Sequence, residues 1–349
     1  MQTINIINKK IGKGWPCFII AEIGINHNGD MNLACKMIDV AATTGVDAVK
    51  FQNYYTDDFI TDQSLKYEYV SQGKTIVESQ YEMFKRYELK PENLKILKDH
   101  CKKTGIIFFS TPSSEMGLKD IIKIGVPLLK NGSDCLTHLP LIKQMAKTGL
   151  PTLISTGMAT LADIDNAVGT YIKAGGNGLI LLHCTSSYPT PSDEVHLLKI
   201  NSLSTAFGCH VGFSDHTWGV TAAIGAVTLG ACVVEKHYTL DKNLPGPDHR
   251  FSADPDELKS LVNGIRAIEK NLGHSKICPT PSEEMGRKEY RYSCIAAKDL
   301  SIGHVLSKED VAFQRPGTGL APKHIDLMLS KTLKRSIKKG DFFQFSDFE

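Results

Sequence analysis

Short apolar runs alternate with amphipathic segments along the first three quarters of the chain. The runs end next to polar residues and are expected to be strands at 17–20, 47–50, 106–109, 127–129, 151–154, 178–182, 210–213 and 231–234. Apolar residues in the intervening segments recur at helical spacing, as at Ile164, Val168 and Ile172. Thr160, three residues before Asp163, is typical of a helix capping box. The pattern predicts eight alternating β/α units.

Eight such units are what a (β/α)8 TIM barrel requires. A doubly wound open sheet is the competing architecture. The glycine-containing stretch 24–29 does not match the GxGxxG fingerprint of dinucleotide-binding sheets, and no Walker lysine motif occurs. The α/β barrel is therefore the expected fold.

The pattern of hydrophobic and polar residues changes after the last amphipathic segment. Residues 276–290 are rich in polar residues and prolines and are expected to be a linker. We predict a barrel domain over 1–275 and a small, mostly-β domain over 291–349, where short strand-like runs alternate with turns. Two stretches of this tail, beginning at Gly303 and Gly340, follow similar leaders, which indicates an internal duplication.

Composition narrows the class of protein. The 349 residues are 42% hydrophobic and 22% charged with a net charge of +2, so we expect a globular protein that binds no nucleic acid. No long uncharged apolar window or signal-peptide core occurs, so we expect no membrane span and a cytoplasmic location. Nine cysteines without a CxxC pair are typical of reduced thiols. The tail from residue 286 is basic, with 12 Lys and Arg against 8 Asp and Glu.

Polar residues follow the predicted strands at the end where barrel enzymes place their active sites. Two lysines and several hydroxyl groups would converge there, a combination that suits the many acceptor oxygens of phosphate and carboxylate. These residues include Lys50, Thr111, Lys130, Ser133, Ser155 and Ser214.

Two histidines are candidate metal ligands. His216 and His237 each lie just past a predicted strand end, in adjacent units seven and eight. Neutral imidazole is a common ligand of divalent metals, and Glu22 and Asp248 are available nearby. The arrangement indicates a metal site above the barrel.

Distinctive motifs are distributed along the whole chain. They are AEIGINHNGD (21–30), VDAVKFQ (46–52), ESQYEMFKRYEL (78–89), FFSTP (108–112), ISTGMATL (154–161), LLHCTSSYPTP (181–191), VGFSDHT (211–217), VVEKHYTLDKNLPGPDH (233–249) and RPGTG (315–319). In these stretches the chain resembles the sialic acid synthase family. The last falls in a tail that resembles the antifreeze-like (SAF, β-clip) domain of these enzymes.

The resemblance implies an enzyme that condenses phosphoenolpyruvate with an N-acetylated amino hexose, releasing phosphate by C–O cleavage. It assigns phosphoenolpyruvate to Lys50, Thr111, Lys130, Ser133, Ser155 and Ser214. It assigns a divalent metal (Mn²⁺, Mg²⁺ or Co²⁺) to His216 and His237, and the sugar to Glu22, Gln52, Tyr188 and Asp248. It also implies a domain-swapped homodimer in which Arg315 of the tail reaches the sugar bound by the partner subunit.

Within this reaction Lys50 and Lys130 would stabilise carboxylate and phosphate charge, and Glu22 would handle protons near the new hydroxyl. N-acetylmannosamine, giving N-acetylneuraminate, is the expected acceptor. A 2,4-diacetamido-trideoxyhexose, giving legionaminic or pseudaminic acid, is the alternative. A phosphorylated acceptor sugar is less compatible because the barrel loops show no arginine cluster.

One position departs from the family pattern. After the fourth strand the family reads K-x-G-S-G-E or K-x-G-S-D-D, whereas here Cys135 takes the place of the final carboxylate. On an extended segment Asp134 would point to the opposite face, so we expect it not to replace that group. A thiol with a pKa lowered by a nearby cation would substitute in part. A weakened enzyme that serves as a sugar-binding or scaffold protein is the alternative from another class.

Overall fold

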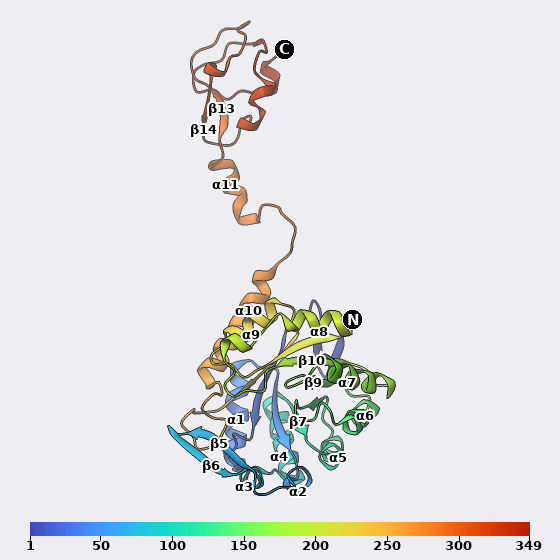
Figure 1. The fold of residues 1–349 in the computed structure, drawn as a ribbon. Coiled ribbons are helices and arrows are strands. Elements are labelled where there is room, and N and C mark those ends of the chain that lie inside the picture. The colour runs from blue at the N-terminus through green and yellow to red at the C-terminus, as the bar shows by residue number, and fades with distance from the viewer. The chain divides into compact units, whose positions relative to one another are not determined.

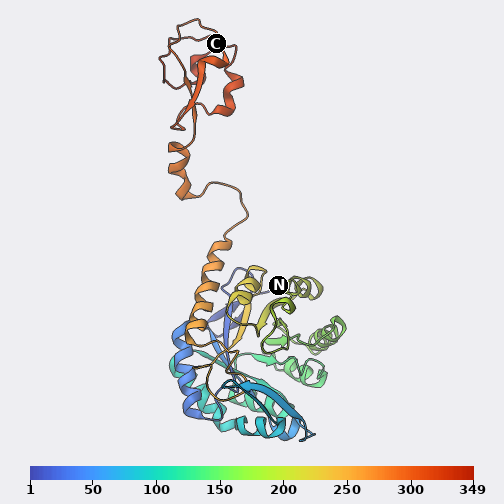
Figure 2. The ribbon, with the colours of Figure 1, turned by 60° about the vertical axis from the view of Figure 1, so that its left-hand side comes forward.

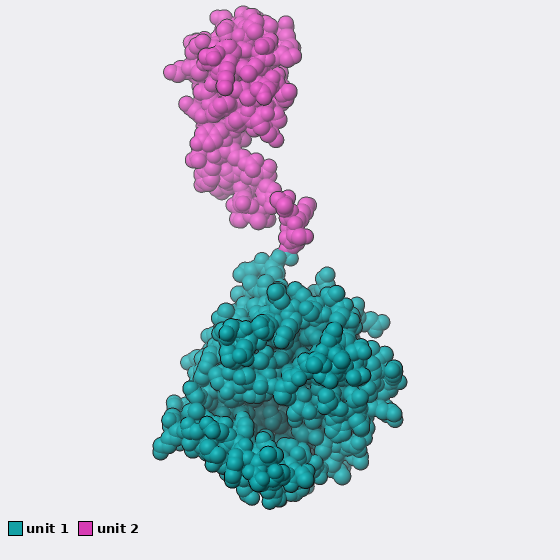
Figure 3. Space-filling view, in the orientation of Figure 1, with its two compact units in different colours: residues 1–273 teal, residues 274–349 magenta.

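The computed structural model describes residues 1–349, which divide into two compact units. The first unit covers residues 1–273 and the second covers residues 274–349 (Figure 3). Every helix falls short of the length and apolarity that crossing a bilayer requires.

The first unit is built on eight parallel strands that close into a barrel (Figure 1). In chain order these are β3 (Phe18–Gly24), β4 (Ala48–Asn53), β7 (Ile107–Pro112), β8 (Leu129–Asn131), β9 (Thr152–Ser155), β10 (Leu179–Cys184), β11 (His210–Asp215) and β12 (Val233–His237). The order around the sheet is β7-β4-β3-β12-β11-β10-β9-β8, and β7 and β8 lie side by side. The predicted barrel is confirmed, and the open-sheet alternative is wrong.

Helices surround this barrel (Figure 2). They are α1 (Met31–Thr44), α4 (Pro91–Thr104), α5 (Glu115–Ile124), α6 (Leu139–Lys147), α7 (Leu161–Lys173), α8 (Lys199–Phe207), α9 (Thr221–Thr228) and α10 (Pro255–Leu272). The predicted capping box starts α7, because Thr160 and Asp163 bond each other's backbone N–H groups. Gly45 ends α1 in the left-handed conformation that glycine adopts without strain.

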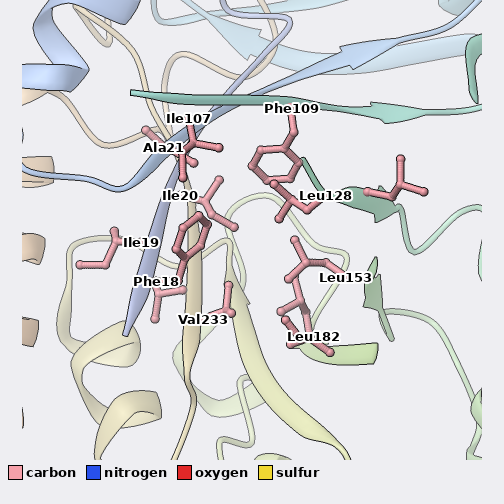
Figure 4. Packing of buried hydrophobic residues seen from close by; sticks show 14 of the residues in the cluster. Phe18, Ile19, Ile20, Ala21, Ile107, Phe109, Leu128, Leu153, Leu182 and Val233 are labelled. Carbon is pink, nitrogen blue, oxygen red and sulfur yellow. The ribbon is translucent and has the colours of Figure 1, made fainter. Parts of the chain in front are cut away.

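The barrel interior is packed with apolar side chains rather than open. Phe18, Phe109 and Leu153 converge from β3, β7 and β9 (Figure 4), and all three are fully or almost fully buried. Because strand side chains alternate between faces, neighbouring residues such as Ile19 pack toward the helices instead. This packed interior forms a rigid floor for the residues at the strand ends.

Short elements are added to the barrel. A hairpin of β1 (Ile4–Ile6) and β2 (Lys9–Ile11) precedes it, and a 3-10 turn (Ser192–Glu194) follows β10. Between β4 and α4 the chain forms α2 (Thr56–Phe59), a second hairpin of β5 (Lys66–Ser71) and β6 (Lys74–Ser79), and α3 (Gln80–Tyr87). The turn of this second hairpin uses positive φ at Gln72 and Gly73, as two-residue hairpin turns require.

The second unit has its own small core, with Leu300, Leu333 and Phe343 buried at its centre. Its elements are α11 (Glu284–Glu289), β13 (Ser293–Ala296), β14 (Val311–Gln314) and four 3-10 turns (Pro281–Glu283, Lys308–Asp310, Pro322–Leu327 and Phe345–Asp347). The predicted linker 276–290 is therefore not devoid of structure, because Thr280 and Glu283 cap a turn that leads into α11.

The duplication within the tail is visible in the second unit. Asp310 and Asp347 occupy equivalent places, each capping a 3-10 turn. Each carboxylate also pairs with a cation that lies the same number of residues earlier in the chain. Lys298 is 2.8 Å from Asp310, and Arg335 is 2.6 Å from Asp347. The two halves thus repeat one structural device.

Candidate active site

A cavity of about 440 Å³ opens at the carboxyl ends of the barrel strands. The side chains that line it include thirteen of the sequence-predicted residues: Glu22, Lys50, Gln52, Thr111, Lys130, Ser133, Asp134, Ser155, Tyr188, Ser214, His216, His237 and Asp248. A larger cavity of about 640 Å³ lies at the opposite end of the barrel, around the N-terminal residues, and no Lys, Arg, Asp or Glu lines it. The acidic and basic side chains expected at an active site therefore lie in the first of these two cavities.

Two buried lysines hold the floor of this cavity. Lys50 Nζ donates to Thr111 Oγ1 at 2.8 Å, and Lys130 Nζ donates to Ser155 Oγ at 2.7 Å. Both ammonium groups are almost completely buried. Two cations and two hydroxyl groups at one place suit an anion with several acceptor oxygens.

Glu235 joins the two lysines and was not assigned a role from the sequence. Its carboxylate oxygens lie 3.7 Å from Lys50 Nζ and 3.7 Å from Lys130 Nζ, and Ser214 Oγ donates to it at 2.9 Å. Burial opposes its charge, but Lys130 and Lys50 outweigh burial and lower the pKa of Glu235. A signal was present: Glu235 precedes His237 by two residues, so both face the same side of one strand.

Glu22 lies on the other side of Lys50. Its carboxylate is 2.8 Å from Lys50 Nζ and accepts a hydrogen bond from Gln52 Nε2 at 3.0 Å. Burial raises the pKa of Glu22, with Glu235 adding to the effect and Lys50 opposing it. The pKa of Glu22 is therefore raised while that of Glu235 is lowered. Such a difference suits Glu22 to donate a proton and Glu235 to remain charged.

Ser133 closes the cavity near β8 and β9. Its hydroxyl accepts a hydrogen bond from the Gly157 N–H at 3.1 Å and donates to Cys184 Sγ at 3.6 Å. A Cβ on Gly157 would lie 2.3 Å from Ser186 Oγ and 2.7 Å from Ser133 Oγ, so only glycine fits there. Cys184 and Ser186 line the cavity too and were not identified from the sequence.

The two histidines meet as predicted. The ring centroids of His216 and His237 are 5.4 Å apart, and Tyr188 packs on His216 at 4.1 Å. His216 Nδ1 donates to the Thr185 carbonyl at 2.8 Å, which leaves its Nε2 free. Burial disfavours charge on His216, but Cys184 and the Thr185 carbonyl outweigh it and raise its pKa.

His237 is the better prepared ligand of the pair. Burial and the charge of His216 hold its pKa well below the usual value, so its imidazole is neutral. Its Nδ1 is buried without a hydrogen bond and lies 3.7 Å from Asp248 Oδ2. No group of three or more His, Cys, Asp or Glu side chains is arranged to enclose a metal. The residues therefore fit an open site that a substrate would complete, rather than a closed structural one.

The segment after β8 does not follow the geometry expected from the sequence. Residues 132–136 form a turn, in which the Cys135 N–H bonds the Gly132 carbonyl and the Leu136 N–H bonds the Ser133 carbonyl. Because the backbone is not extended, Asp134 lines the cavity while Cys135 does not. The expectation that Asp134 points away is wrong.

The expected activation of the Cys135 thiol is also wrong. Burial, with Asp134 close by, raises the pKa of Cys135 to about 12, so the group stays a neutral thiol. Lys130 acts in the opposite direction but is outweighed. Asp134, rather than Cys135, is the candidate for the family's carboxylate.

Arg315 belongs to the second unit. It follows β14, and its guanidinium stacks over Tyr290 at 5.7 Å and Tyr292 at 5.5 Å. Aromatic faces on a cation restrict its orientation while leaving its hydrogen-bond donors available.

Comparison with known proteins identifies both units. The NeuB family matches residues 37–277 and the SAF domain matches residues 293–349. The N,N'-diacetyllegionaminic acid synthase of Legionella pneumophila is 40% identical over 95% of this chain and 94% of its own length. The enzyme of that name from Campylobacter jejuni is 39% identical over 93% and 98%.

A solved structure agrees in fold as well as sequence. The N-acetylneuraminic acid synthetase of Leptospira borgpetersenii, determined in complex with citrate, has a TM-score of 0.74 and 36% identity. The match covers 82% of this chain and 95% of that one. With a family match over most of the chain and full-length relatives named as synthases, this chain is an enzyme of the sialic acid synthase type and belongs to the NeuB family.

Proposed function

We propose that this enzyme condenses phosphoenolpyruvate with an N-acetylated amino hexose, forming a nine-carbon 2-keto acid and phosphate. The observation that carries the proposal is the cavity floor, where two buried lysines and their hydroxyl partners lie next to Glu22 and the histidine pair. The test is release of phosphate from phosphoenolpyruvate that depends on an added amino sugar.

Phosphoenolpyruvate occupies the floor. Its carboxylate and phosphate bind Lys50 and Lys130, with Thr111, Ser155 and Ser214 supplying hydroxyl donors to the same anion. The residues lining the cavity include no arginine and no third lysine. The cavity therefore has cations for one phosphorylated substrate, which supports an acceptor sugar without a phosphate.

In the proposed reaction C3 of phosphoenolpyruvate attacks the aldehyde carbon of the open-chain sugar, whose oxygen takes up a proton and becomes a hydroxyl. Water adds at C2, and the tetrahedral intermediate loses phosphate as the C2–O bond breaks. Glu22, whose pKa burial raises, delivers the proton to the new hydroxyl. Phosphoenolpyruvate with ¹⁸O in the bridging position tests the bond cleaved, because label retained in the keto acid contradicts C–O cleavage.

His216 and His237 would hold the divalent metal, Mn²⁺, Mg²⁺ or Co²⁺. When bound, such an ion supplies Lewis-acid polarisation of the aldehyde oxygen. The unpaired Nδ1 of His237 supports this assignment. Full activity after exhaustive EDTA treatment, or in His216→Ala, would contradict it.

The acceptor sugar is either N-acetylmannosamine or a 2,4-diacetamido-trideoxyhexose. The Leptospira structure, named for N-acetylneuraminic acid, supports the first at 36% identity. The relatives at 40% and 39% identity, both named for N,N'-diacetyllegionaminic acid, support the second. Gln52, Tyr188 and Asp248 are placed to contact either sugar.

The enzyme acts as a domain-swapped homodimer in which Arg315 completes the site of the partner subunit. Mixing Lys130→Met with Arg315→Ala tests this, because the mixed dimer joins an intact floor to an intact Arg315. We expect each variant alone to be impaired and the mixture to regain activity. No recovery after subunit exchange would contradict the swap.

The nine free thiols support the predicted cytoplasmic location.

A further inference from the structure

The two arginines of the SAF domain have different surroundings. Arg335 pairs with the buried carboxylate of Asp347 at 2.6 Å. Arg315 is exposed and forms no ion pair within the chain, and its guanidinium instead lies over the rings of Tyr290 and Tyr292 at 5.7 and 5.5 Å. The charge of Arg335 is therefore used within the domain, whereas that of Arg315 remains for a ligand.

The rings of Tyr290 and Tyr292 contribute little to the core of the second unit. They are 61% and 50% exposed, and neither belongs to the hydrophobic cluster at the centre of the unit. The Tyr290 N–H nevertheless bonds the Gly286 carbonyl at 2.8 Å, and a Cβ on Gly286 would lie 3.2 Å from Tyr290 Cδ2. The Tyr290 ring thus packs on the bare backbone of α11, although much of its surface stays in solvent.

The loop after β14 is fastened to the elements that carry these rings. Ser293 Oγ, at the start of β13, donates to the Pro316 carbonyl at 2.6 Å and accepts from the Gly319 N–H at 2.9 Å. The Gly317 N–H bonds the Lys288 carbonyl of α11 at 2.7 Å. The backbone on which Arg315 stands is therefore held against both α11 and β13.

A stacked guanidinium is prepared for binding in a way that a free arginine side chain is not. A long side chain that is ordered only when its ligand arrives loses rotamer freedom, and this loss weakens binding. Aromatic rings contact the faces of the guanidinium, whereas its N–H donors lie in the plane and stay available. Stacking on Tyr290 and Tyr292 thus restricts Arg315 without using its donors.

We propose that Tyr290 and Tyr292 are positioning residues that hold the Arg315 guanidinium ready to bind the acceptor sugar. This inference rests on the proposed function, in which Arg315 contacts the sugar. The two rings act on the affinity for the sugar and leave the binding of phosphoenolpyruvate by the lysine floor unchanged.

The test measures steady-state kinetics of the full-length enzyme with both rings removed, Tyr290→Leu with Tyr292→Leu. The acceptors are N-acetylmannosamine and a 2,4-diacetamido-trideoxyhexose, each with phosphoenolpyruvate and Mn²⁺. We expect KM for the reacting sugar to rise about 3- to 10-fold, the effect of ordering one long side chain on binding. The kcat and the KM for phosphoenolpyruvate should stay within about twofold, because the lost interaction is with the sugar alone.

Two controls separate the rings from the fold of the domain. Tyr290→Phe with Tyr292→Phe keeps both aromatic faces and should retain the wild-type KM for the sugar. Phe345→Leu removes another exposed ring of the same domain, 53% exposed, and should also leave that KM unchanged. An unchanged KM for the sugar in the leucine variant, or an equal rise in the KM for phosphoenolpyruvate, would overturn the proposal.

A double-mutant cycle with Arg315→Ala tests whether the rings act through Arg315. Arg315→Ala alone should raise the KM for the sugar, and adding the two leucine substitutions should raise it no further, because the rings then have no guanidinium to hold. Additive effects would show that the rings act independently of Arg315. Additive effects, or a normal KM in Arg315→Ala alone, would overturn the proposal.

The ¹⁵Nε–Hε NMR signal of Arg315 separates this inference from the function on which it rests. Its loss in Arg315→Lys identifies the signal, and ring currents should place it upfield in the wild type relative to the leucine variant. If no sugar releases phosphate but this shift is present, the proposed function fails and the positioning by the rings stands. If phosphate is released and the signal is the same in both proteins, the function stands and the positioning fails.

Discussion

Strands β11 and β12 carry buried charges on both of their faces, and the two faces differ in how completely those charges are satisfied. On the outer face Lys236 Nζ pairs with Asp215 at 2.9 Å and donates to the Thr217 carbonyl. The other oxygen of Asp215 accepts from the N–H and hydroxyl of Thr217 at 2.9 and 2.8 Å. Every charge there has close partners.

The cavity face holds a looser cluster. Glu235 is shared between Lys50 and Lys130 at 3.7 Å each, and its Oε2 makes no hydrogen bond. Lys50 also lies 2.8 Å from Glu22, so the loosely paired group on this face is the Glu235 carboxylate, whereas both oxygens of Asp215 have close partners. Complete pairing of a buried carboxylate thus indicates a structural role, and incomplete pairing indicates a binding role.

The outer pair is expected to show its role in stability. Lys236→Met leaves Asp215 buried without its cation, which costs about 3–5 kcal/mol of unfolding free energy. Urea unfolding monitored by circular dichroism measures the change. Residual activity of the folded fraction is expected to stay near wild type, and a variant as stable as wild type would break the comparison.

The cavity pair is expected to show its role in catalysis. Lys130→Met removes a preorganised cation from the anion site and should lower kcat/KM by about 100- to 1000-fold. The melting temperature should change far less than in Lys236→Met. An active Lys130→Met enzyme, or one that fails only by unfolding, would reverse the assignment of the two faces.

Asp310 of the second unit sharpens the comparison, because its carboxylate is buried while its partner Lys298 is 59% exposed. Burial opposes its charge, but Lys298 and His304 outweigh it and hold the pKa of Asp310 far below the unfolded value. Its stabilisation, about 1–3 kcal/mol, is therefore present above the unfolded pKa near 4 and is lost as pH falls below it.

Hydrogen exchange of residues 293–349 as a function of pH measures this effect. Wild type should lose protection on acidification below about pH 4, the range in which unfolded aspartate takes up protons. Asp310→Asn should be less protected at neutral pH and less sensitive to acid. Identical pH profiles would show that the pair contributes nothing.

The smallest effect is expected at Cys135. Its thiol is neutral and lies outside the cavity, so Cys135→Ser should change kcat/KM by less than about threefold, equivalent to well under 1.4 kcal/mol. Asp134→Asn, one residue earlier and lining the cavity, is the matched variant and should lower kcat/KM more. If Cys135→Ser lowers kcat/KM more than Asp134→Asn does, Cys135 is the functional residue instead.

The barrel and most of the cavity could be predicted from the sequence. The alternation of side chains along a strand determines which face each residue lies on, and the end of each strand determines which residues lie at the mouth of the barrel. Lys50 and Gln52 illustrate this, two residues apart on one face of β4. Asp134 could not be predicted, since alternation holds only for extended backbone and this segment turns. The role of Glu235 was not predicted because it depends on two lysines from distant strands.

The small hydrophobic cluster beside the cavity was also not predictable from the sequence, because Ile25 packs with Tyr54, Met83 and Tyr87 only through the fold. The sequence likewise gave no sign that Ser71 and Gln72 fasten the hairpin to the loop around Gly246. Such contacts join segments far apart in the chain.

The most direct test of the account is product formation by the purified full-length chain supplied with phosphoenolpyruvate, Mn²⁺ and each N-acetylated amino hexose. We expect phosphate and a nine-carbon 2-keto acid in equal amounts, with formation of both abolished in Lys130→Met and retained in Cys135→Ser. Tight binding of phosphoenolpyruvate and sugar without release of phosphate from any pair would contradict it and identify the cavity as a binding site alone.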